Sequence, residues 1–280
     1  MLAGMDRSVI ELRVGGLPHP HGGMDGEWRY RHAVRPDGPT PVDHQAVADF
    51  LAYETGHGRR VDVIADPDLS GWRTWRPPDV RPDPGAFPVQ CCTHAYPGGC
   101  AAGLVCHGAP ATAAARILAD GALRSATAVT GRSARDLAAA STWGEPADYF
   151  DHVMLANGRC TAPEAVACSR VLGRDLTPAD LMPGYPPAVR FYFRWRWLAS
   201  HPGARFDGVH PVKILSGLRL GEGLVAVVAP ASQRRLITTC AGPFLDRIAF
   251  VDIERPSPRD WAVAAFAAAS GNVFTAMSPT

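Results

Sequence analysis

The stretch GLVCHGAPATAAARILADGALR, residues 103–124, is the most regular part of the chain. Its first six residues, 103–108, have the composition of a strand that ends on a His-Gly turn. A helix rich in Ala, Ile and Leu is predicted to follow from Pro110 to Leu123 and to stop around Gly121. The best-defined unit of the sequence is therefore a strand that leads straight into a helix.

Toward the C-terminus, several segments rich in β-branched and aromatic residues predict further strands. They are residues 153–156, 189–193, 224–229 and 247–253, and a helix over residues 261–269 closes the chain. These strands are not separated by regularly spaced helices, as a series of βαβ units requires. The pattern therefore predicts an α+β fold.

Toward the N-terminus, Pro- and Gly-rich breakers interrupt residues 1–90 repeatedly. Between the breakers, residues 42–55 predict a short helix and residues 60–65 a strand. The run Pro-Asp-Pro-Gly at residues 82–85 indicates a boundary. We therefore predict a Pro/Gly-rich extension or small subdomain over residues 1–90 and a main domain over residues 91–280.

Composition limits the classes of function. The chain has 280 residues, 46% of them apolar, and a formal net charge of +1, which excludes general disorder. Near-neutral charge provides no overall attraction for nucleic acid, so a nucleic-acid partner is not favoured. The N-terminus lacks the pattern of a secretory signal, and no stretch reaches the ~18–20 apolar residues of a membrane span. A soluble, cytoplasmic protein without a membrane partner is expected.

The seven cysteines form an odd number in a chain with no export signal, which predicts reduced thiols. Several thiolate or imidazole groups cluster in one segment, namely Cys91, Cys92, His94, Cys100, Cys106 and His107. Zinc binds both ligand types, but the spacing contains no C-x-x-C pair, and adjacent residues of a strand point to opposite faces. Cysteines packed in the core are the preferred interpretation. A zinc site and a cysteine nucleophile activated by histidine stay open as alternatives.

The strand ending in His107-Gly108, with the helix ending in ILADGAL at residues 117–123, resembles the opening of a known fold. This is the ADP-ribosyltransferase fold of the poly-ADP-ribose polymerase and tRNA 2′-phosphotransferase type. Residues 190–193, 224–228 and 247–251 resemble strands of DNA-modifying ADP-ribosyltransferase toxins. The likeness spans residues 104–253 and implies a split antiparallel β core. Residues 148–213 also look like proteins of actinobacterial specialised metabolism.

This resemblance implies that NAD+ is the substrate. In the family the histidine reaches the adenosine ribose and the glycine backbone contacts the nicotinamide amide, which His107 and Gly108 match. Tyr149 is the preferred residue to stack on nicotinamide. Glu222 is the closest match to the glutamate that binds the nicotinamide ribose and supports an oxocarbenium-like transition state. The implied catalytic residues are therefore Glu222 and His107.

Two cationic residues complete the predicted cofactor-binding set. Arg190 begins a row in which Arg194 and Arg196 alternate with it, an arrangement that can clamp a pyrophosphate, although a solvated sheet face is more common. Lys213 is the only lysine of the chain and a candidate for binding a phosphate or carboxylate. The preceding Asp207-Gly208 is interpreted as a surface turn. The pair Asp148 and Asp151, with His152, is given no catalytic role.

The leading hypothesis is a transferase that cleaves the nicotinamide–ribose bond of NAD+, with a small molecule of specialised metabolism as the acceptor. One alternative is an NAD-independent biosynthetic enzyme or hydrolase that relies on the cysteine and histidine cluster, with or without zinc. Another is a non-catalytic binding protein on a degenerate version of the fold.

Overall fold

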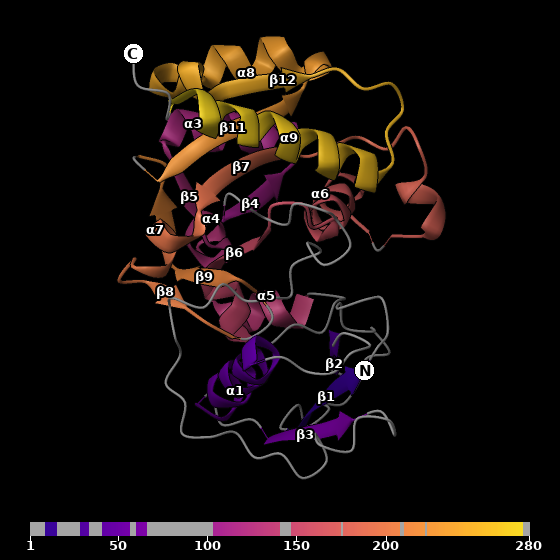
Figure 1. Cartoon of the computed structure of the whole chain (residues 1–280), viewed down its shortest axis with the longest axis vertical. Helices are drawn as coiled ribbons and strands as arrows, with labels where there is room; N and C mark the ends of the chain where they lie inside the picture. Colours follow the sequence, from indigo (N-terminus) through magenta and orange to yellow (C-terminus); the bar gives the residue numbers. More distant parts are fainter. Residues whose placement is uncertain are drawn as a thin grey trace.

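The structure is a computed structural model, which describes residues 9–15, 29–33, 41–56, 60–65, 103–140, 147–174, 176–207, 210–221 and 223–276. Strands and helices are mixed along these residues, and seven of the described strands form one sheet (Figure 1). The predicted α+β class is consistent with this architecture. No helix within the described ranges is both long and apolar enough to cross a membrane.

The large sheet has the strand order β12-β11-β7-β4-β6-β9-β8. Its strands are β4 (Leu104–Ala109), β6 (His152–Asn157), β7 (Val189–Arg194), β8 (Ala204–Arg205), β9 (Val212–Leu215), β11 (Leu224–Pro230) and β12 (Ile248–Val251). The pairing is antiparallel except between β11 and β12, which are parallel. The predicted strand that ends in His-Gly is thus the central strand β4, between β7 and β6.

Helices cover both faces of this sheet because side chains alternate along its buried strands. Val105 and Phe191 belong to one core cluster together with side chains of α3 (Ala111–Asp120) and α8 (Arg234–Cys240). Cys106 and Tyr192 belong to a second cluster with side chains of α9 (Pro258–Ala276). Figure 1 shows α9 lying across β11 and β7. The predicted helix stop at Gly121 is confirmed by its left-handed φ of 62°.

Shorter elements connect these layers. They are β5 (Ala122–Arg124), which pairs with β10 (Gly217–Arg219), α4 (Ala126–Thr130), α5 (Ala134–Ala140), α6 (Ala162–Leu172), α7 (Trp195–Ala199) and the 3-10 turns η2 (Ala147–Asp151), η3 (Pro178–Leu181), η4 (Ala231–Gln233) and η5 (Gly242–Arg247). The predicted row of arginines ends earlier than expected, because β7 stops at Arg194 and Arg196 lies on α7. Trp195, the first residue of α7, is buried.

The described part of residues 1–90 contains regular structure. β1 (Val9–Gly15) pairs in parallel with β2 (Arg29–Ala33) and β3 (Arg60–Ala65), and α1 (Pro41–Gly56) lies between β2 and β3 in sequence. The helix and the strand predicted at residues 42–55 and 60–65 are confirmed, whereas β1 and β2 were not predicted. In Figure 1 this unit lies beneath α5. Side chains at the end of α1 contact η2, which directly precedes β6 of the large sheet, as described below.

Candidate functional site

His107 lies on β4 at the point where this strand parts from β6. β4 pairs with β6 only through Val105 and Cys106, whereas its pairing with β7 continues to Ala109. The Nδ1 atom of His107 lies 3.0 Å from the backbone oxygen of Met154 in β6. Because a carbonyl oxygen only accepts, Nδ1 carries the proton and donates it. The imidazole therefore bridges the two strands where their ladder ends.

The surroundings keep this imidazole neutral. Burial lowers the pKa of His107 to about 4, against the opposing effect of its bond to Met154, and the charge of Arg170 on α6 lowers it further. With Nδ1 protonated, the neutral ring presents Nε2 as an acceptor. No described residue donates to Nε2, and the side chain stays partly exposed. His107 is therefore able to accept a hydrogen bond from a hydroxyl group of another molecule.

The helix α3 begins directly after β4, with Pro110 in the N-cap position. No side chain caps this helix, and its first turn holds no acidic residue. The N–H groups at a helix N-terminus carry partial positive charge and favour an anion. The uncapped N-terminus of α3 therefore lies a few residues after His107 in the chain, at the C-terminal end of β4.

Gly108 is required by packing. A Cβ atom at this position would lie 2.6 Å from the Cβ atom of Pro163 and 3.3 Å from its carbonyl oxygen. Pro163 is buried near the start of α6, so the contact involves backbone and a rigid ring. Gly108 thus lets α6 lie directly against β4.

The variant Gly108→Ala should lose about 1–3 kcal/mol of stability, the usual range for overpacking. Gly271→Ala is the matched control, since Gly271 lies in α9 and its added Cβ would meet nothing within 4 Å. The same substitution there should be neutral or stabilise by up to about 1 kcal/mol. Urea denaturation of both variants measures the difference, and similar values would contradict the packing role of Gly108.

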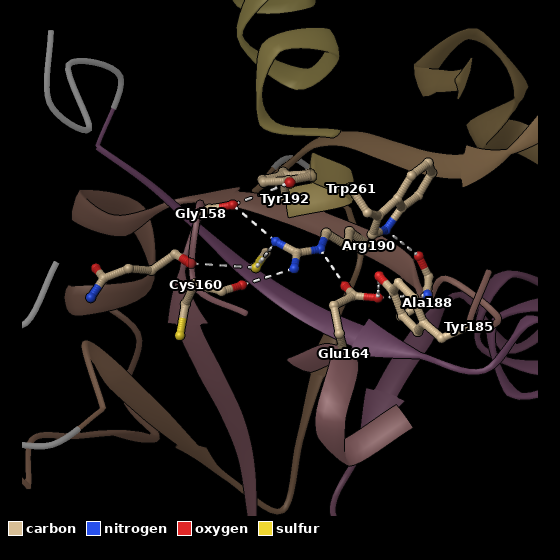
Figure 2. A network of polar contacts seen from close by, with 10 residues as sticks. Gly158, Cys160, Glu164, Tyr185, Ala188, Arg190, Tyr192 and Trp261 are labelled. Atoms are coloured by element: carbon tan, nitrogen blue, oxygen red, sulfur yellow. Dashed lines mark hydrogen bonds and ion pairs between the residues drawn. The ribbon is translucent and has the colours of Figure 1, made fainter. Parts of the chain in front are cut away.

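Arg190, the cross-strand neighbour of Gly108, lies in a closed network of polar contacts (Figure 2). Its Nε atom donates to Glu164 on α6 at 2.7 Å, and both side chains are fully buried. The other two guanidinium nitrogens donate to the backbone oxygens of Gly158 at 3.1 Å and Cys160 at 2.8 Å. All three nitrogens of Arg190 are therefore engaged inside the protein.

The carboxylate of Glu164 is equally well satisfied. Its second oxygen accepts from the hydroxyl of Tyr185 at 2.9 Å and from the backbone N–H of Ala188 at 2.8 Å. Because the network is buried and closed, it leaves no accessible guanidinium for a ligand. The prediction that Arg190 binds a cofactor pyrophosphate is therefore corrected to a structural role that joins α6 to β7.

A second buried cluster surrounds Lys213 on β9. Lys213 alternates with core residues of this strand and points to the opposite face. Its Nζ atom lies 3.0 Å from Oδ2 of Asp207, and both side chains are fully buried. The ammonium also lies over two aromatic rings, 3.7 Å from the centroid of Tyr53 and 3.8 Å from that of Tyr149. The structure thus brings together two predicted site residues, Tyr149 and Lys213.

Two side chains of α1 take part in this cluster. The hydroxyl of Tyr53 donates to the carboxylate of Asp148 at 2.5 Å. The hydroxyl of Tyr149 donates to Glu54 at 3.2 Å. The rings of Tyr53 and Tyr149 meet edge to face, with centroids 6.0 Å apart. The cluster therefore combines side chains of α1 with side chains of η2, of β9 and of the loop between β8 and β9.

The charged groups of the cluster shift one another's pKa values. Burial acts against ionisation of Asp207, but the charge of Lys213 and the contact with His210 hold the pKa of this carboxyl well below its usual range. His210 contributes its Nδ1 atom at 2.9 Å and its backbone N–H at 2.7 Å. Burial lowers the pKa of Lys213, and Asp207 acts in the opposite direction. Asp207 is therefore a buried anion held between an ammonium and an imidazole.

Some sequence-based candidates cannot be placed. Glu222, Cys91, Cys92, His94 and Cys100 lie outside the described residues. Cys106 is buried in the core beneath α9, on the face of β4 opposite to His107, as strand alternation predicted. In the described part of the chain, no group of three or more His, Cys, Asp and Glu side chains is arranged to hold a metal ion.

The sequence analysis missed most partners of Lys213. Asp207 was interpreted as part of a surface turn, but its side chain is fully buried. Asp148 was given no role, and Tyr53 belongs to the Pro/Gly-punctuated N-terminal segment. The one signal that pointed to this cluster was the unusual presence of a single lysine. Tyr149 and Lys213 are enclosed by α1 here, and their roles in binding NAD+ stay predictions.

Comparisons of the chain with protein-family models, with curated proteins and with solved structures found no match.

Proposed function

We propose that the protein uses NAD+ as a substrate and cleaves its nicotinamide–ribose bond, as ADP-ribosyltransferases do. The observation that carries this proposal is the neutral imidazole of His107, whose Nδ1 atom is held by Met154 and whose Nε2 atom accepts. A ribose hydroxyl is a donor of the required kind. The parting of β4 and β6 at His107 also fits the split β core that the sequence resemblance implies.

The start of α3 supports the same ligand. The uncapped helix N-terminus lies directly beyond His107 and Gly108, and such a terminus favours the charge of a pyrophosphate group. An NAD+ molecule with a ribose hydroxyl at His107 and its pyrophosphate at the N-terminus of α3 uses both the imidazole acceptor and the uncapped helix end. Arg190 has no part in this arrangement.

The proposed reaction breaks the bond between C1′ of the ribose and the nicotinamide nitrogen. The bonding electron pair leaves with nicotinamide, which becomes neutral, and positive charge develops on the ribose. An oxygen or nitrogen of the acceptor then forms the new bond to C1′ and loses its proton. A nearby carboxylate stabilises the developing cation, and the sequence resemblance gives this role to Glu222. The near-neutral charge of the chain favours a small-molecule acceptor.

The test is a calorimetric titration of the protein with NAD+, with nicotinamide release followed by chromatography. Wild-type protein should bind NAD+ and release nicotinamide, and His107→Ala should bind about tenfold more weakly because a hydrogen bond is lost. His201→Ala is the matched control, since His201 lies in the turn after α7 and its Nδ1 atom contacts the backbone of Gly203. Unchanged affinity in a folded His107→Ala variant, or no binding by the wild type at millimolar NAD+, would refute the proposal.

A further inference from the structure

Asp207 and His210 form a carboxylate–imidazole pair in the loop between β8 and β9. The Nδ1 atom of His210 lies 2.9 Å from Oδ2 of Asp207, and the backbone N–H of His210 donates to Oδ1 at 2.7 Å. Asp207 therefore holds both the main chain and the ring of His210. The ammonium of Lys213 lies 3.0 Å from the same Oδ2 atom. The imidazole is thus attached to a buried anion that is itself held in place by a cation.

The pair determines which ring nitrogen of His210 carries the proton. Although burial opposes ionisation, the charge of Lys213 keeps the pKa of Asp207 well below its usual range, so the carboxylate only accepts. Nδ1 of His210 is therefore protonated and donates to Asp207, and Nε2 of the neutral ring carries the lone pair. No described residue donates a hydrogen bond to Nε2, and 26% of the side chain is exposed. Another molecule is able to reach this nitrogen.

His210 differs from the other three histidines whose side chains the structure describes. In His107 and His152, Nδ1 donates to a backbone carbonyl oxygen, which is a neutral acceptor. In His201, Nδ1 accepts from the backbone N–H of Gly203 at 3.0 Å, so Nε2 carries the proton. A carboxylate partner stabilises the positive charge that a ring acquires when its other nitrogen forms a new bond. Of these four histidines, only His210 combines a carboxylate partner with an accessible lone pair.

An imidazole held in this way is suited to nucleophilic catalysis. Histidine is one of the side chains that form covalent intermediates, provided that the reacting nitrogen is unprotonated and the ring is oriented. No described hydroxyl or thiol group donates to Nε2 of His210. Within the described residues the ring therefore has no serine or cysteine to activate, and the ring itself is the reactive group. Because the side chain is largely buried, a small substrate is favoured.

We propose that the Asp207–His210 pair is a catalytic site for small carboxylic esters, in which His210 is the nucleophile and Asp207 is a positioning residue. Lys213 holds Asp207 and does not touch the substrate. The inference goes beyond the NAD+ proposal and does not rest on it.

The proposed reaction has two steps. Nε2 attacks the carbonyl carbon of the ester, and the bond from this carbon to the leaving oxygen breaks, with its electron pair leaving on the alkoxide. The acyl group is now bound to a positively charged ring, which Asp207 stabilises. Water then attacks the acyl carbon, and the electron pair of the broken C–N bond returns to Nε2. The proton that water releases neutralises the alkoxide, so the products are a carboxylic acid and an alcohol.

The first experiment measures the hydrolysis of p-nitrophenyl acetate by the full chain. The wild type should release p-nitrophenol over many turnovers, and His210→Gly should do so about tenfold more slowly, with the remaining histidines setting the background. His201→Gly is the matched control and should keep the wild-type rate, because the ring of His201 has the other tautomer. Equal rates in the wild type and a folded His210→Gly variant would overturn the proposal. A wild-type rate no higher than that of free imidazole at the same concentration would overturn it too.

Added imidazole separates a chemical role of His210 from a structural one. His210→Gly keeps the backbone N–H that donates to Asp207, and it leaves the place of the missing ring open to a free imidazole molecule. Millimolar imidazole should therefore raise the rate of His210→Gly in a saturable way. With His201→Gly it should give only a linear increase that does not depend on the protein. A linear increase in both variants would mean that His210 only stabilises its loop.

Asp207→Asn tests the positioning role of the carboxylate. The variant keeps the shape of the side chain and removes the charge that stabilises the acylated ring, so kcat for the ester should fall with little change in KM. An unchanged kcat would contradict the role given to Asp207. If this variant does not fold, the rescue by imidazole still decides the role of His210.

Carbethoxylation by diethyl pyrocarbonate provides an independent readout, because this reagent transfers its group to an unprotonated ring nitrogen. Cleavage after Arg205 places His201 and His210 in different peptides, so mass spectrometry compares their rates of modification. His210 should be modified faster than His201, and the loss of ester hydrolysis should follow the modification of His210. Hydrolysis that persists after His210 has been modified would rule out Nε2 as the nucleophile.

Discussion

The variant Glu164→Ala is expected to lose about 3–5 kcal/mol of unfolding free energy, the loss typical of removing one partner from a buried ion pair. Without the carboxylate, the guanidinium of Arg190 stays buried with no opposite charge beside it. The hydroxyl of Tyr185 and the N–H of Ala188 also lose their acceptor, and buried donors without partners are costly. Urea denaturation of the variant and the wild type measures the loss.

The matched control for Glu164→Ala is a surface ion pair. Arg174 donates to Asp180 at 2.9 and 2.8 Å, and about half of the Arg174 side chain is exposed. Arg174→Ala should cost less than about 1 kcal/mol, because solvent screens the pair. Similar losses of unfolding free energy in the two variants would show that burial does not explain the contribution of the Arg190 network to stability. Glu164→Gln should fall between them, since its amide oxygen still accepts.

The variant Lys213→Met is expected to lose a similar amount at pH 7, about 3–5 kcal/mol, because it leaves the carboxylate of Asp207 buried without its ammonium. Methionine keeps an unbranched side chain of similar length, so the loss reports the charge more than the volume. Arg124→Met is the matched control: its ion pair with Asp120, at 3.5 Å, is about half exposed on both sides. That variant should change the stability by less than about 1 kcal/mol.

The effect of Lys213→Met should depend on pH in a defined direction. In the wild type the pKa of Asp207 is held low, so its contribution to stability is present above the unfolded pKa of about 3.9 and is lost as the pH falls. In the variant, burial without the ammonium raises the pKa of Asp207, so acid protonates the carboxyl and relieves the penalty.

The stability difference between Lys213→Met and the wild type should therefore shrink between pH 7 and about pH 4.5. The carboxylates of Glu54 and Asp148 also face this cluster, so the variant is compared with the wild type at each pH. Urea denaturation at both pH values measures the difference. A difference that is constant with pH would mean that Asp207 is not the group left unpaired.

Local signals identified many of the regular elements of the chain. The strand at β4, the helix α3 with its stop at Gly121, and the strands β7 and β11 follow from propensity and from breakers within a few residues, which act in any fold. The sequence analysis also anticipated that Cys106 and His107 lie on opposite faces of a strand, because alternation is a property of extended backbone. The expected role of His107 came from a short motif, and that role stays a prediction.

Tertiary structure decided which of these side chains meet. Arg190 was interpreted as a ligand-binding or solvated residue, but it pairs with Glu164, which lies 26 residues away on α6. Asp207 was interpreted as a surface turn, yet it is buried against Lys213, and Tyr53 reaches the same place from α1. Whether a charged side chain is exposed, paired or catalytic depends on which groups the fold places around it, because charges interact more strongly in the interior than in water. The packing of distant segments brings those groups together, and a pattern read along the chain does not contain that information.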